Sequence, residues 1–181
     1  MTARQERQAL LGEWSAQLVT RSGIHLNVRP SAPDDQQQIL EFLKAVTPAD
    51  LRFRFLAAVR PSDALARLFS NVDHSNIESL LAFDAGDARL VAIAMIASEG
   101  PTSTAEVAIV VRSDLKNKGI GWTLLAHSCA FAMARGFKRV ECIESSENRT
   151  AVSLEEEMGF QSRSCPGDAT LTILSRELNP G

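Results

Sequence analysis

Apolar residues in the first third of the chain recur mainly with the period of an α-helix. Over residues 3–18 they fall on one face, which predicts an amphipathic N-terminal helix. Thr47 before Pro48 is typical of a helix start, because threonine caps a helix and proline suits its first position. Residues 24–28 alternate apolar and polar side chains instead, as a half-buried strand does. The pattern therefore predicts one strand among helices at residues 3–18, 34–46, 47–56 and 61–69.

From residue 77 onward the pattern changes to that of strands. Two apolar segments, residues 80–83 and 90–97, flank a turn that contains Gly86, which predicts an antiparallel hairpin. Residues 104–111 are almost continuously apolar, as in a central strand covered on both faces. The rest of the chain predicts a helix that Gly136 ends, a strand at 138–144, a helix at 148–157 and two short strands around the turn at 166–168.

The segment between the apolar strand and the next helix carries the most informative chemistry. It reads Lys116, Asn117, Lys118, Gly119, Ile120, Gly121 and Trp122. A loop that ends at a helix N-terminus exposes N–H groups without internal partners, and glycines let an anion approach them. The alternative is a tight turn that needs glycine for backbone reasons, but the two lysines favour an anion site. The glycines required by P-loop and dinucleotide-binding patterns are missing.

Length and composition fit a single folded domain. The chain has 181 residues, against a prior of about 150 per domain, and is 45% hydrophobic. Its net charge of -3 gives no general attraction to nucleic acid. We find no apolar signal segment and no run near the about 18 apolar residues of a membrane span. Because the three cysteines also lack metal-ligand spacing, we expect a cytoplasmic location without metal, membrane or nucleic-acid partners.

Two motifs in sequence order resemble the GNAT superfamily of N-acyltransferases. In that superfamily a strand is followed by Gln or Arg, two residues, and Gly-x-Gly or Gly-x-Ala, and here Lys116 takes the first place. The segment from Asn148 through Ala151 to Met158-Gly159-Phe160 is similar to its Asn-x-x-Ala helix before Leu-Gly-Phe. Within the superfamily, residues 47–55 and 110–116 resemble the acetyltransferase domain of Pat-type bacterial protein lysine acetyltransferases.

The resemblance covers roughly residues 24–178 and implies a fold. We expect an α/β (α+β) domain with a mixed, mostly antiparallel central sheet of about six or seven strands flanked by helices. Residues 1–22 then form an N-terminal helical extension, and residues 23–181 form the acyl-CoA N-acyltransferase domain.

The resemblance also implies a reaction, in which an acetyl group moves from acetyl-CoA to a primary amine by direct attack. A lysine amine has a pKa near 10.4, so a base must first remove a proton. Glu106 matches the glutamate that serves as base in Pat-like enzymes, and it is the only charged residue in the segment 105–111. We expect the apolar strand to desolvate Glu106 and so strengthen it as a base. The alternative is a solvated residue at a strand end.

The contacts to CoA are expected in the loop and its neighbours. The backbone of a bulged, splayed strand faces the pantetheine arm, and Asn148 either binds that arm or caps its helix. The predicted set is Val110, Val111, Lys116, Asn117, Lys118, Gly119, Ile120, Gly121, Trp122 and Asn148.

The usual proton donor of the superfamily is missing from this chain. Many members protonate the leaving thiolate with a tyrosine one residue after the position of Leu154. Glu155 stands there, and the sequence contains no tyrosine at all. We therefore expect water to protonate the thiolate, or the thiolate to leave unaided. The run Glu155-Glu156-Glu157 is typical of a solvated helix face, and with nearby glutamates it could favour cationic acceptors.

Three classes of function remain open at this point. The first is an acetyl-CoA-dependent N-acetyltransferase, monomeric or homodimeric, that acts on a small amine or on a protein lysine such as that of an acyl-CoA synthetase. The second is a CoA-binding sensor without turnover. The third is an unrelated protein that binds a phosphate-containing ligand.

Overall fold

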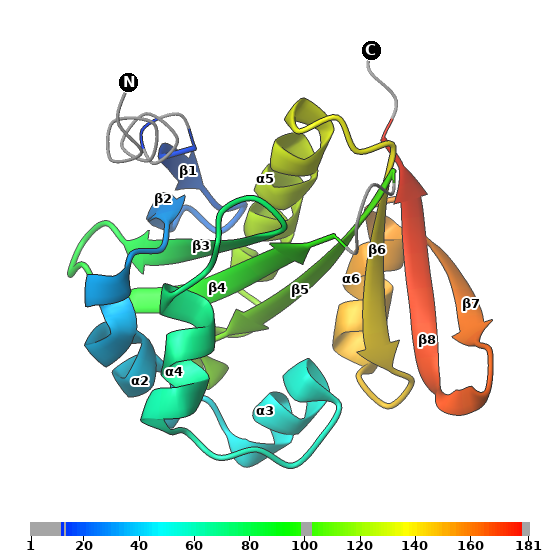
Figure 1. The fold of residues 1–181 in the computed structure, drawn as a ribbon, viewed down its shortest axis with the longest axis horizontal. Helices are drawn as coiled ribbons and strands as arrows, with labels where there is room; N and C mark the ends of the chain where they lie inside the picture. Colours follow the sequence, from blue (N-terminus) through cyan, green and yellow to red (C-terminus); the bar gives the residue numbers. More distant parts are fainter. Residues whose placement is uncertain (1–11, 13, 99–102, 179–181) are drawn as a thin grey trace.

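A computed structural model describes residues 12, 14–98 and 103–178. They form an eight-stranded sheet in the order β1-β2-β3-β4-β5-β6-β8-β7. Neighbouring strands are antiparallel except β5 and β6, which run parallel (Figure 1). The strands are β1 (Ala16–Val19), β2 (His25–Pro30), β3 (Ile77–Asp84), β4 (Leu90–Ala97), β5 (Thr104–Val111), β6 (Arg139–Ser145), β7 (Gln161–Cys165) and β8 (Asp168–Glu177).

Helices cover both faces of this sheet (Figure 1). In β3, Leu80 and Ala82 pack in one apolar cluster with residues of α5, whereas Leu81 and Phe83 pack in a second cluster with residues of α2, α3 and α4. This division follows from the alternation of side chains along a strand. The helices are α2 (Gln36–Lys44), α3 (Pro48–Phe55), α4 (Asp63–Ser70), α5 (Ile120–Ala134) and α6 (Arg149–Glu157).

Most elements lie where the sequence pattern places them. The β3–β4 hairpin, β5, α5, β6, α6 and the β7–β8 hairpin are all confirmed. Thr47 caps α3, because its side-chain oxygen accepts a hydrogen bond from the N–H of Asp50 at 3.2 Å. Gly136 follows α5 with φ of 88°, a conformation that favours glycine. No helix among the described residues is long and apolar enough to cross a membrane.

The N-terminal segment differs from the prediction. Residues 1–11 and 13 lie outside the described part of the chain, but Ala16–Val19 form strand β1, antiparallel to β2, rather than the end of a helix. Leu18 packs against the cluster around α5 while Val19 is exposed, so a period of two governs these residues. β1 raises the number of strands to eight, above the six or seven expected.

The parallel strands β5 and β6 diverge soon after they meet. Only Thr104, Ala105 and Glu106 pair with β6, opposite Arg139 to Glu141. β5 continues in register with β4 through Val111, so the expected bulge at Val110 and Val111 is absent from this pairing. Figure 1 shows the two strands close at one end and apart at the other. Beyond Glu106, one edge of β5 therefore has no neighbouring strand among the described residues.

Candidate active site

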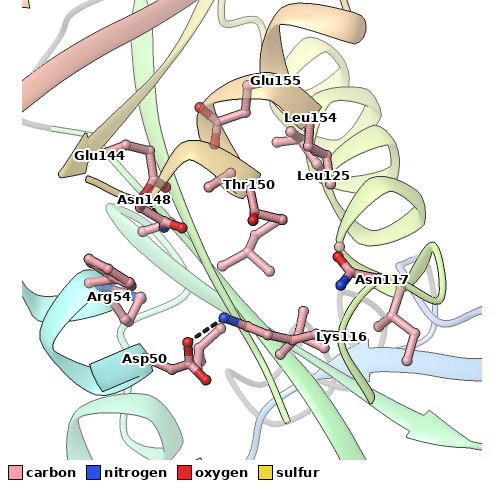
Figure 2. Close-up of a pocket in the computed structure, with 18 of the residues that line it drawn as sticks. Asp50, Arg54, Lys116, Asn117, Leu125, Glu144, Asn148, Thr150, Leu154 and Glu155 are labelled. Atoms are coloured by element: carbon pink, nitrogen blue, oxygen red, sulfur yellow. Dashed lines mark hydrogen bonds and ion pairs between the residues drawn. The ribbon is translucent and has the colours of Figure 1, made fainter. Parts of the chain in front are cut away.

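A cleft opens where β5 and β6 diverge. Its volume is about 990 Å³ including its open mouth, which is enough for a sizeable organic ligand. Its walls come from the end of β5, the start of α5, α3, the end of β6 and α6. In Figure 2, Lys116 and Asp50 lie on one side of the cleft, and Glu144, Asn148 and Glu155 lie on the other. The cleft therefore has a loop end and a carboxyl end.

The loop end is built from backbone. Gly119 is the N-cap of α5 and has φ of 78°, and Asn117 also has a positive φ of 60°. The N–H of Thr123 donates to the oxygen of Gly119, so the N–H groups before it in the first turn have no carbonyl partner within the helix. These groups and the positive end of the helix dipole favour an anion at this end of the cleft.

The turn between β1 and β2 supports this loop. The hydroxyl of Ser22 donates to the backbone oxygen of Lys118 at 2.6 Å. The guanidinium of Arg21 lies 3.7 Å from the centre of the Trp122 ring, within range of a cation–π interaction. The β1–β2 hairpin that the sequence analysis missed thus holds the outer side of the predicted anion site.

Most of the predicted CoA-binding residues line the cleft, but two do not. Lys118 is exposed and Trp122 lies beneath Arg21, so neither side chain belongs to the wall. The residues that do line the cleft are Val110, Val111, Lys116, Asn117, Gly119, Ile120, Gly121 and Asn148.

The backbone of Val110 is oriented differently from the expectation. The N–H of Arg112, directly after β5, donates to the oxygen of Val91 in β4. Because backbone groups alternate in direction along an antiparallel strand, the N–H and C=O groups of the even-numbered residues of β5 face β4. Ile109 and Val111 therefore present N–H and C=O groups to the open edge of the strand, whereas Val110 does not. Val110 contributes its side chain to the wall instead.

The charge of Lys116 already has a partner in the cleft. Its ammonium forms an ion pair with Asp50 of α3. Asp50 also accepts a hydrogen bond from the hydroxyl of Ser113 at 2.5 Å. Although burial opposes it, hydrogen bonds from Lys116, Ser113 and Thr47 hold the pKa of Asp50 below its usual value. This pair ties α3 to the loop end.

Glu106 is not desolvated, contrary to the expectation. It lies at the last pair of β5 with β6, opposite Glu141, and its residue is exposed. It does not belong to the wall of the cleft, although its charge acts on Arg54, which does. The alternative of a solvated position is therefore the correct description of its surroundings.

The carboxyl end contains a pair that the sequence analysis did not predict. Glu144 of β6 and Glu155 of α6 both line the cleft, and the charge of Glu144 acts on Glu155. Burial raises the pKa of Glu144 to about 7. Burial and the neighbouring charge of Glu144 raise the pKa of Glu155 to about 9. The interpretation of residues 155–157 as a solvated face is wrong for Glu155, which is only 5% exposed.

Two neighbours define the surroundings of this pair. The side-chain amide of Asn148 donates to Glu144 at 2.8 Å, rather than capping α6. Arg54 of α3 is half-buried in the wall, and its Nε has no hydrogen-bond partner within the part of the chain that the structure describes. Burial lowers the pKa of Arg54, while Glu144 and Glu106 favour its charged form. The carboxyl end thus combines one cation with two acidic groups.

Signals for both acidic residues were present in the sequence. Val140, Cys142 and Glu144 alternate along β6, and the first two are buried, so Glu144 continues an inward row. Val152, Glu155 and Met158 recur at helical spacing, which places Glu155 on the apolar side of α6. Each carboxyl therefore interrupts a pattern of buried apolar positions.

An anion-binding helix start beside two diverging parallel strands is the arrangement of an acyl-CoA-dependent N-acetyltransferase. The chain belongs to the acetyltransferase (GNAT) family, whose model matches residues 45–160. This assignment confirms the family to which the two sequence motifs pointed, and acetyl-CoA is the co-substrate of that family.

Known proteins support the same assignment. An acetyltransferase of Pseudomonas aeruginosa is 27% identical over 154 residues, which cover 83% of each protein. The crystal structure of the GNAT domain of S. lividans PAT superposes with a TM-score of 0.84 at 23% identity, over 92% of this chain and 98% of that one. Spermidine N-acetyltransferase from Vibrio cholerae, in complex with CoA and spermine, gives a TM-score of 0.69 at 17% identity, over 84% and 95%. The two structures show a shared fold.

Proposed function

We propose that this protein transfers the acetyl group of acetyl-CoA to the side-chain amine of a protein lysine. The observation that carries the proposal is the single cleft that joins the start of α5 to the divergence of β5 and β6. A phosphate group at the helix start and a thioester near the carboxyl end fit the two chemistries of this cleft. The similarity of the fold to the GNAT domain of S. lividans PAT supports the choice of a protein substrate.

The residues of the loop end would bind CoA. Free N–H groups at the start of α5 would bind the pyrophosphate, and Lys116 would add a positive charge beside them. The open edge of β5 offers the backbone groups of Ile109 and Val111 to the amides of the pantetheine arm. Gly121 faces Leu154 and Val111, where a Cβ would lie 3.7 Å from each side chain. The arm would thus pass between β5 and α6.

Glu106 would serve as the base for the ammonium of the acceptor. It marks the point at which β5 and β6 separate, so an acceptor that enters there meets its carboxylate. Because Glu106 is exposed, it can pass the proton directly to solvent. The neutral amine would then attack the thioester carbon, and CoA would leave as the thiol without a covalent enzyme intermediate.

The experiment that tests the function measures free thiol release from acetyl-CoA. The protein is incubated with acetyl-CoA and either lysine-containing peptides, a folded acceptor such as an acyl-CoA synthetase, or small amines. We expect thiol release that depends on a lysine acceptor, with mass spectrometry locating the added acetyl group. Tight CoA binding without thiol release with any amine would instead indicate a sensor.

A small polyamine is the second candidate acceptor. Glu144 and Glu155 line the cleft, and Glu147, three residues after Glu144, forms a 2.8 Å ion pair with Arg52. Such a group of carboxylates favours cations, and the similar fold from Vibrio cholerae acts on spermidine. A kcat/KM for spermidine above that for lysine peptides would favour this candidate over a protein substrate.

A further inference from the structure

The carboxyl pair Glu144–Glu155 has features that packing alone does not require. Glu155 is buried, and its Oε2 has no hydrogen-bond partner among the described residues, although it lines the cleft. Leaving a buried polar atom unpaired opposes folding, so such an atom is expected to gain a partner when a ligand binds. The groups that act on the charge of Glu155 are Glu144 and the thiol of Cys142.

The surroundings place one proton on the pair. Two neighbouring carboxylates in a poorly solvated site cannot easily both be charged. The charged groups that face Glu144 are Arg54 of α3 and Lys116 of the loop, and Asn148 adds a hydrogen bond. Among the described residues, the groups that act on Glu155 besides Glu144 are the thiols of Cys142 and, at longer range, Cys129. The negative charge therefore rests on Glu144 and the proton on Glu155.

We propose that Glu144 and Glu155 form a one-proton acid–base pair, in which Glu144 takes a proton from the attacking nitrogen and Glu155 protonates the leaving sulfur. The inference rests on the proposed acetyl transfer. It replaces the expectation that water protonates the thiolate or that the thiolate leaves unaided. Glu155 follows Leu154 in α6, and both residues line the cleft. The Cδ1 of Leu154 lies near Gly121 at the loop end.

The proton balance of this step closes within the protein. The acceptor ammonium first loses one proton through Glu106 to solvent. The neutral nitrogen then forms the C–N bond, the C–S bond breaks, and its electron pair stays on sulfur. Sulfur takes the proton of Glu155, and Glu144 takes the second proton that nitrogen must lose. One proton remains on the pair and returns from Glu144 to Glu155 within the cleft that both residues line.

The test compares kcat for three variants across about pH 6 to 10, the range in which both groups titrate. Glu155→Gln is expected to lower kcat about 100-fold and to remove the fall of wild-type kcat at alkaline pH. Glu144→Gln should lower kcat by a similar factor and remove the rise of wild-type kcat near neutral pH. The KM for acetyl-CoA should stay within about twofold in both. Glu157→Gln, an exposed neighbour on α6, is the matched control and should behave as wild type.

A wild-type pH profile of kcat in Glu155→Gln or in Glu144→Gln would overturn the proposed pair. An equal loss of kcat in the control Glu157→Gln would overturn it as well. A measurement on the unaltered protein covers variants that fail to fold. At pH 8 the infrared spectrum of wild type should retain a carbonyl band of a protonated carboxyl group, which disappears only at more alkaline pH. A spectrum without that band refutes the shared proton. If wild type releases no thiol with any amine, the proposed function fails and the relay has no reaction, whether or not the band is present.

Discussion

The two ends of the cleft are built by different means. At the loop end the working groups belong to the backbone of residues 119–122, and their direction follows from the start of α5. At the carboxyl end they are side chains from two elements, Glu144 on β6 and Glu155 on α6. The loop end attracts an anion whatever the pH, whereas the carboxyl end changes with its protonation. Binding and proton transfer are thus assigned to separate parts of one cleft.

The contrast also separates two kinds of cost. A helix start exposes unpaired N–H groups to solvent, and water satisfies them until a ligand arrives, so little stability is lost. Burying two carboxyl groups opposes folding unless at least one is neutral. The destabilising groups of the cleft, the two buried carboxyls, therefore lie at the end where the proposed proton transfer takes place.

The largest effect that we expect is the dependence of stability on pH at the carboxyl end. The folded-state pKa values of Glu144 and Glu155 are raised, to about 7 and about 9. Their contribution is fully present below the ordinary glutamate pKa and is lost as pH rises through those two values, a change on the order of several kcal/mol.

Chemical denaturation at pH 4, below the ordinary glutamate pKa, and at pH 10 measures this dependence. Glu155→Gln should match wild type at the lower pH and exceed it at the higher, because the amide never ionises. Glu157→Gln should show the wild-type difference between the two conditions. A Glu155→Gln protein that loses stability on alkalinisation as wild type does would show that Glu155 is not the titrating group.

A change at Gly121 should disrupt the loop end alone. Gly121→Glu places a carboxylate where the pyrophosphate would lie, and such like-charge contacts cost several kcal/mol, so CoA affinity should fall about 1000-fold. Gly121→Ala is the control, because its Cβ meets Leu154 and Val111 at an ordinary 3.7 Å. Calorimetric titration with CoA measures both. An unchanged affinity in Gly121→Glu would remove the anion site from this loop.

The loop end could be predicted from sequence because its pattern is local. An apolar strand, two glycines with lysines beside them and a helical period lie within about twenty consecutive residues, and no distant contact is needed to interpret them. The boundaries of β5 agree with the prediction for the same reason. β1 was missed because the apolar spacing of residues 3–18 suits a helix, whereas pairing with β2 gives its four residues a period of two.

The carboxyl end depends on contacts that are distant in sequence. Glu144 and Glu155 each fall in a row of buried positions, but neither row shows that the two carboxyls meet. Glu106 illustrates the opposite error, since an apolar sequence around it suggested burial. Glu106 is exposed although Ala105 and Val107 beside it are buried, because successive side chains of a strand point to opposite faces of the sheet. Apolar neighbours in the sequence therefore do not show that a strand residue is buried.

Replacement of Glu106 tests whether the exposed carboxylate or the buried pair removes the first proton. Glu106→Gln should lower kcat about 100-fold at neutral pH, the usual scale for a lost general base. CoA affinity should be unchanged, because Glu106 lies outside the cleft wall. A more alkaline reaction should restore part of the rate, since more acceptor amine is then neutral. Normal turnover at neutral pH would assign that proton to Glu144 instead.

The smallest effect is expected from the support of the loop by the β1–β2 turn. Ser22→Ala removes the hydroxyl that donates to the backbone oxygen of Lys118 at 2.6 Å. Such a bond contributes about 1 kcal/mol, so CoA affinity should fall about fivefold while kcat at saturating acetyl-CoA stays unchanged. Ser164→Ala on the exposed strand β7 is the control. A loss of kcat without a loss of affinity would mean that the turn acts on the carboxyl end, and the two ends would then not be independent.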